Sequence, residues 1–84
     1  MKVPDNIMEY WKRNCSPGDK VRISRTTPLL QSTVTKAFDS WALPETIEII
    51  NKWFSYCRNE QPPKFALHSI LKQRGVKYQR SNNN

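Results

Sequence analysis

The segment from Thr27 to Trp41 separates into two chemically different faces when it is drawn as one helix. Its apolar residues recur at helical spacing and predict the buried stripe of a helix docked on a core: Leu30, Val34, Ala37, Phe38 and Trp41. The opposite face carries four polar residues, Gln31, Ser32, Thr35 and Lys36. Their amide, hydroxyl and ammonium groups match the hydrogen-bonding edges of bases in a DNA major groove. The pattern therefore predicts a helix suited to base recognition.

The length of 84 residues supports one compact domain with a small core. Only 37% of the residues are hydrophobic, but three Trp, three Tyr and three Phe are among them, so we expect a few large side chains to dominate the packing. A second copy of the chain would supplement a core of this size. The net charge of +7 favours an anionic partner.

The positive charge is concentrated in two segments. Residues 12–36, which include part of the two-faced helix, hold six basic residues against one acidic residue, for a net charge of +5. Residues 37–60 hold two basic against four acidic residues, and residues 61–84 hold five basic residues and no acidic one. Residues 12–36 and residues 61–84 are therefore the two candidate segments for contact with an anion.

Start and stop signals predict four helices in residues 1–60. Pro4 and Asp5 open the first helix, which ends near Asn14 and Cys15. Ser16 as cap and Pro17 at the first helical position open a second helix that runs to about Arg25. Thr27 and Pro28 mark either the opening of the third helix, around Leu30–Ser40, or the turn that leads into it.

The fourth predicted helix begins at Pro44 and runs to about Arg58. Its apolar stripe is Ile47, Ile50, Phe54 and Cys57, and Ile49 with Trp53 would widen that stripe toward a neighbouring helix or a second subunit. After a polar, proline-rich connector at 59–63, a fifth helix is expected from Lys64 to Arg74, ending at Gly75. Its buried side would be Phe65, Leu67, Ile70 and Leu71. Residues 76–80 fit an edge strand or an extended basic arm.

These residues lead to a resemblance: Lys20–Phe38, KVRISRTTPLLQSTVTKAF, resembles the helix-turn-helix of the phage Cro and lambda-repressor-like DNA-binding family. The core of the match is QSTVTKAF at 31–38. Pro44, Glu45 and Thr46 also resemble the opening of the helix that follows the reading helix in lac-type repressors. The resemblance implies an all-α fold, a small bundle of about five helices that contains a helix-turn-helix, with a basic extended C-terminal tail.

Three positions depart from the family pattern. Pro28 stands where the turn usually has glycine, so the positive φ of that turn is not available here. Thr27 replaces a habitual apolar residue, and the small residue of the second helix is Ser24 rather than alanine. We therefore expect the turn to be built differently, which affects the docking angle of the reading helix.

The resemblance assigns base contacts to the reading helix, namely Gln31, Ser32, Thr33, Thr35 and Lys36, and a phosphate contact to Lys20. From the residue chemistry alone, Gln31 suits adenine and Lys36 the acceptors of guanine. Arg22 and Arg25 suit phosphates, which add affinity and salt dependence but no sequence information. Residues 1–60 would form the DNA-binding domain, and residues 61–84 a C-terminal helix and tail that pack on it or mediate association.

The expected function is a small sequence-specific regulator, repressor-like, that binds double-stranded DNA as a homodimer. The alternative is a protein-interaction module, such as an antitoxin or an inhibitor of a host protein, that uses the C-terminal region. We expect no enzymatic activity, because residues with the spacing of a catalytic site are absent from the sequence. Cys15, Cys57 and His68 lack metal-ligand spacing, so we expect no metal, no cofactor and no small-molecule effector. Two isolated thiols and no apolar leader or membrane span favour a cytoplasmic location.

Overall fold

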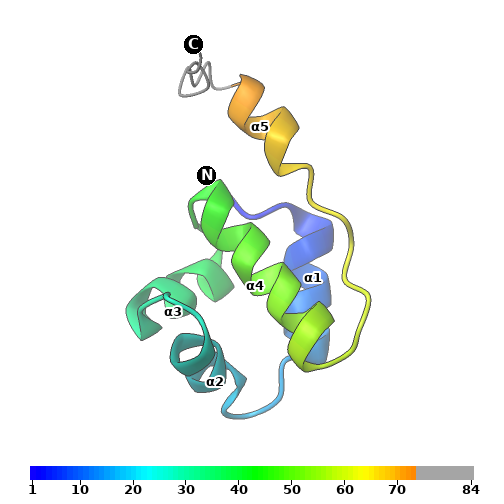
Figure 1. Cartoon of the computed structure of the whole chain (residues 1–84). Helices are drawn as coiled ribbons and strands as arrows, with labels where there is room; N and C mark the ends of the chain where they lie inside the picture. Colours follow the sequence, from blue (N-terminus) through cyan, green and yellow to red (C-terminus); the bar gives the residue numbers. More distant parts are fainter. Residues whose placement is uncertain (74–84) are drawn as a thin grey trace.

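Helices make up all the regular structure that the computed structural model describes, which is residues 1–73 (Figure 1). In chain order these are α1 (Asp5–Asn14), α2 (Asp19–Thr26), α3 (Gln31–Asp39), α4 (Pro44–Cys57) and α5 (Leu67–Gln73). The only strand-like pairing in this range is one isolated bridge between Lys2 and Trp41. The structure thus confirms the predicted small all-α bundle of about five helices.

Side chains from the helices α1, α2, α3 and α4, together with Val3 and Ala42, form the core. Its buried apolar residues are Val3, Ile7, Trp11, Ile23, Val34, Ala37, Phe38, Ala42, Ile47, Ile50, Trp53 and Phe54. The Trp11 ring from α1 stacks on Phe38 from α3, with 5.2 Å between ring centres. This aromatic contact joins α1 directly to α3, on the face of α3 opposite its polar residues.

The buried side chain of Asn51 connects the core to the segment that follows α4. Its Oδ1 accepts a hydrogen bond of 3.0 Å from the indole Nε1 of Trp11, and its Nδ2 donates one of 2.6 Å to the carbonyl oxygen of Pro63. Because a buried amide is costly without partners, these two bonds fix Trp11 and the connector at 59–66 together. The connector runs back along the bundle, and α5 lies beyond it (Figure 1).

The N-terminal segment holds the junction between α3 and α4. The amide of Val3 donates to the carbonyl oxygen of Ser40 at 2.7 Å, and the amide of Ala42 donates to that of Met1 at 3.0 Å. Val3 is itself buried in the core. This short pairing fixes the chain immediately after α3 and so limits how α3 can move.

Two predicted helix starts are wrong. α2 begins at Asp19 instead of Pro17, because Gly18 takes a left-handed φ of 88°, which a right-handed helix cannot contain. Ser16 is not the cap: its amide donates to the carboxylate of Asp19 at 2.7 Å. α5 begins at Leu67 instead of Lys64, and residues 59–66 before it form no regular structure.

The apolar stripe predicted for α4 is correct except at its end. Ile47, Ile50 and Phe54 are fully buried, whereas Cys57 is exposed. Trp53, predicted to face a neighbour, is buried, and its indole Nε1 donates to the Thr26 hydroxyl of α2 at 3.0 Å. The neighbour that Trp53 meets is therefore α2.

The four apolar residues predicted for the inner side of the fifth helix are only half-buried. Phe65 lies before the helix and packs against the core. The predicted helix end at Gly75 and the strand or basic arm at 76–80 lie outside the described residues. No helix within residues 1–73 is long and apolar enough to cross a membrane.

Replacing Asn51 with Ala should lower the free energy of unfolding by about 2–3 kcal/mol, because the change leaves the Trp11 indole N–H and the Pro63 carbonyl without their partner. Urea denaturation followed by circular dichroism measures this loss. Asn14→Ala is the matched control: the Asn14 amide donates only to the Tyr10 carbonyl on its own helix, so we expect a change below about 1 kcal/mol. Equal losses in the two variants would contradict a structural role for the Asn51 bridge.

Candidate nucleic-acid interface

The two faces of α3 differ in burial as the sequence predicts. Val34, Ala37 and Phe38 are buried against the core. The opposite face is exposed and holds the residues Gln31, Ser32, Thr35 and Lys36, and Thr33 lies half-buried at its edge. The side chains of Gln31, Ser32 and Thr35 make no hydrogen bond to any residue in the described range 1–73. Their donors and acceptors are therefore free to meet a ligand.

Leu30 and Trp41 do not belong to the buried stripe, which corrects the prediction at both ends of α3. Leu30 is 70% exposed and Trp41 is 44% exposed. The reason is that α3 spans only Gln31–Asp39, so Leu30 and Trp41 lie on non-helical backbone and do not continue the helical face. The core under α3 consists of its middle residues alone.

α2 and α3 lie side by side (Figure 1), and their contact is the most extensive between any two helices within residues 1–73. Ile23 is the fully buried residue of α2, whereas Ser24, expected at the close contact, is half-buried and donates its hydroxyl to the Val21 carbonyl at 2.8 Å. The two helices are joined by the four residues 27–30. The pair has the length and order of a helix-turn-helix, with α3 as its second helix.

Thr27 builds the turn between these helices without any left-handed residue. Its amide and its hydroxyl both donate to the Ile23 carbonyl, at 3.0 and 2.6 Å, and the hydroxyl accepts from the Leu29 amide at 3.2 Å. Within the described residues, positive φ values occur only at Gly18 and Asn59. Pro28 is thus accommodated because a threonine hydroxyl supplies the hydrogen bonds, and Thr27 ends α2 instead of opening α3.

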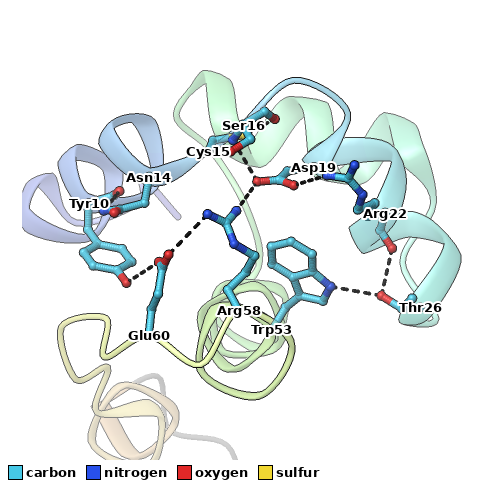
Figure 2. Close-up of polar contacts among 10 residues, drawn as sticks. All are labelled: Tyr10, Asn14, Cys15, Ser16, Asp19, Arg22, Thr26, Trp53, Arg58 and Glu60. Carbon is cyan, nitrogen blue, oxygen red and sulfur yellow. Dashed lines mark hydrogen bonds and ion pairs between the residues drawn. The ribbon is translucent and has the colours of Figure 1, made fainter.

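A buried carboxylate anchors the start of α2 (Figure 2). Asp19 has no solvent exposure and accepts hydrogen bonds from the Ser16 amide, from Arg22 at 2.7 Å and from Arg58 after α4. Arg58 also reaches Glu60 at 3.2 Å. An acidic residue near a helix start is the one local sign of this network, because its partner Arg58 lies 39 residues away along the chain.

The network continues to α1 through Tyr10. Tyr10 donates its hydroxyl proton to Glu60 at 2.8 Å, and partial burial together with this bond raises the pKa of Tyr10 to about 12. Burial, and then the nearby Asp19 carboxylate, raise the pKa of the Cys15 thiol, so this thiol stays protonated at neutral pH. Cys15 and Cys57 are both free thiols. The start of α2 is therefore tied to α1 and to the end of α4 at once.

The basic residues predicted to contact phosphate differ in how they are held. Arg22 is paired with Asp19, although its side chain remains 62% exposed. Lys20 is half-buried with its Nζ 5.5 Å from the centre of the Phe38 ring, a cation–π contact. Arg25 is exposed and has no ion-pair partner among residues 1–73. Arg25 is thus the most available of the three.

Lys36 and Asp39 define the far end of the polar face. The Nζ of Lys36 lies 5.0 Å from the centre of the Trp41 ring, so the exposed indole positions this ammonium group. Asp39, which the sequence analysis did not place on this face, is exposed in the last turn of α3. Its negative charge would repel phosphates, which restricts an anion-contacting surface to the first two turns of the helix.

Asp19→Asn should lower the free energy of unfolding by about 2–3 kcal/mol, because it keeps the shape of the side chain but removes the charge that Arg22 and Arg58 pair with. Thermal or urea denaturation measures the loss. Asp5→Asn is the matched control. This carboxylate is exposed and lies 4.0 Å from the exposed Lys2, so the pair is weak and its removal should lower the free energy of unfolding by no more than about 0.5 kcal/mol. If the two variants are equally stable, the Asp19 network does not anchor α2.

The chain matches no family model, no curated protein and no solved structure in the comparisons made with them. Within residues 1–73, His, Cys, Asp and Glu side chains form no group of three or more that could hold a metal ion. What the interface can bind is therefore inferred from the side chains of α2 and α3 and from the charge around them.

Proposed function

We propose that this chain is a sequence-specific DNA-binding regulator, a binding module and not an enzyme, that inserts α3 into the major groove. One observation carries the proposal: within residues 1–73 the side chains of Gln31, Ser32 and Thr35 on the outer side of α3 are exposed and make no hydrogen bond, while its inner side is buried. An α-helix fits the width of the major groove, and short polar side chains on its outer face reach base edges. The resemblance of residues 20–38 to Cro and lambda-repressor-like proteins supports the same role.

The packing of α2 on α3 supports a helix-turn-helix mode of docking. In that mode the first helix crosses the phosphate backbone and the second lies in the groove with its N-terminal residues at the bases. Gln31 would then bind adenine and Lys36 guanine, with Ser32 and Thr35 reaching bases or phosphate and Thr33 at the margin. Within the described residues no side chain caps α3, so the amides of its first turn add positive potential at that end.

Charge and symmetry complete the proposal. Arg25, Lys20 and Arg22 would hold phosphates on either side of the groove. One such domain covers one half-site, so we propose that a homodimer binds a two-fold symmetric site in cytoplasmic DNA. Tyr56 and the half-buried Ile49 line a hollow on α4 with Thr26 and Thr27, and this surface is available to a second copy.

The proposal is tested by selecting bound sequences from a random DNA pool and then measuring the affinity of variants for the selected site. Gln31→Ala and Lys36→Ala should each weaken specific binding by about 1–3 kcal/mol, because each removes a contact to a base edge. Their affinity for random DNA should change much less. Selected sites should be palindromic if a dimer binds.

Lys12→Ala is the control for lost charge, because Lys12 is an exposed lysine on α1, outside α2 and α3. It should leave discrimination between selected and random DNA unchanged. The proposal fails if no sequence is enriched, or if the α3 variants discriminate as well as the unaltered protein. Recovery of one stoichiometric protein partner with no DNA binding at about 50 mM salt would favour the protein-interaction alternative.

Arg25→Ala should reduce the salt dependence of DNA binding. Loss of one phosphate contact lowers the slope of log affinity against log salt concentration by about 0.9, and affinity should fall about equally for specific and random DNA. Arg22→Ala should change the slope less, because Asp19 already neutralises part of that charge. Fluorescence anisotropy titrations at four or more salt concentrations measure both slopes. An unaltered slope for Arg25→Ala would exclude Arg25 from the phosphate contacts.

A further inference from the structure

Leu30 is a large aliphatic side chain held in solvent beside the polar face of α3. It is 70% exposed and directly precedes Gln31, the first residue of the helix. Its neighbour Leu29 is half-buried and packs against the core. The backbone at Leu30 is extended, with φ −74° and ψ 151°, so the side chains of Leu29 and Leu30 point in different directions. The inward position of Leu29 thus accounts for the outward position of Leu30.

The backbone that carries Leu30 is fixed on both sides. Its carbonyl oxygen accepts the first hydrogen bond of α3, from the Val34 amide at 3.0 Å. On the other side the Leu29 amide donates to the Thr27 hydroxyl at 3.2 Å. The backbone of Leu30 is therefore already ordered, so binding a ligand would cost only the conformational entropy of its side chain.

The stability of the fold does not explain a leucine at this position. Leu30 occupies the cap of α3, where Ser, Thr, Asp or Asn would satisfy a free amide and stabilise the helix more. Leucine offers no hydrogen bond to a phosphate or to a polar base edge. In the major groove the one apolar group on a base edge is the C5 methyl of thymine.

We infer that Leu30 packs against the C5 methyl of a thymine next to the base pair that Gln31 contacts, and so determines part of the sequence specificity. This inference rests on the proposed DNA-binding function and adds a residue to it. The surrounding charge is complementary to DNA, since residues 12–36 carry six basic residues against one acidic residue. The contact combines an apolar reading group with the hydrogen-bonding groups of Gln31 and Ser32 on the same turn.

The first experiment compares the sequences selected by the unaltered protein, by Leu30→Ala and by Leu67→Ala. Leu67 is the control: it is the first residue of α5 and lies outside α2, α3 and the turn between them. We expect Leu30→Ala to lose the preference for thymine at one position of the half-site and to keep the others. Leu67→Ala should select the full site.

The second experiment replaces that thymine with deoxyuridine, which removes only the methyl group. Affinity of the unaltered protein should fall about fourfold, the effect of exposing one methyl-sized group, whereas Leu30→Ala should bind both sites equally. Deoxyuridine at another thymine of the site serves as the control for the DNA. This comparison uses the unaltered protein, so it does not depend on the folding of a variant.

The outcomes separate the two proposals. If α3 variants lose discrimination but deoxyuridine and Leu30→Ala weaken binding independently of each other, the DNA-binding function stands and the methyl contact is wrong. If the selection retains no thymine adjacent to the base pair that depends on Gln31, the inference is overturned as well. If no sequence is enriched at all, the DNA-binding function fails and the role of Leu30 fails with it.

Discussion

The orientation of α2 and α3 depends on the hydrogen bonds and ion pairs that the buried carboxylate of Asp19 makes. A charge without solvent exposure is stable only while its donors remain in place, and here the donors come from the chain before α2, from α2 itself and from the residue that follows α4. Moving α2 away from α4 would break the hydrogen bond between Arg58 and this carboxylate. Trp53 adds a second connection of α4 to α2 through Thr26. Because α3 packs most closely on α2, the angle at which α3 faces solvent follows from these contacts.

The same arrangement determines how much positive charge is available near α3. Asp19 partly neutralises Arg22, and the rings of Phe38 and Trp41 position the ammonium groups of Lys20 and Lys36. Exposed cation–π contacts are weak, on the order of 0.5–1 kcal/mol, so a phosphate or a guanine can replace them at small cost. The contacts nevertheless restrict where these two lysines lie in the free protein. The ammonium groups of Lys20 and Lys36 are therefore held at defined positions beside α3.

The sequence predicted those features that depend on local periodicity and failed where distant residues decide. The helices α1, α3 and α4 and the two faces of α3 follow from apolar spacing and from proline at helix starts, and the structure has them. The start of α2 was misplaced because Pro17 and Gly18 form a turn closed by Asp19, whose burial requires Arg58 from far along the chain. Periodicity predicts only that Trp53 faces a neighbouring helix or a second subunit, because it does not show that Thr26 supplies the partner for its indole.

The errors at the two ends of α3 have one physical origin with a consequence for recognition. Helical periodicity predicts that Leu30 and Trp41 continue the buried stripe, but the helix ends at Gln31 and Asp39, and both residues are exposed. The core does not need them, because Val34, Ala37 and Phe38 already fill the space beside Trp11 and Ile23. The outer surface of α3 is therefore a polar strip with an apolar side chain at each end. In the proposed complex, hydrogen bonds from this strip would depend on base identity, and an apolar group at its edge would add discrimination that charge alone cannot provide, because phosphates are the same at every base pair.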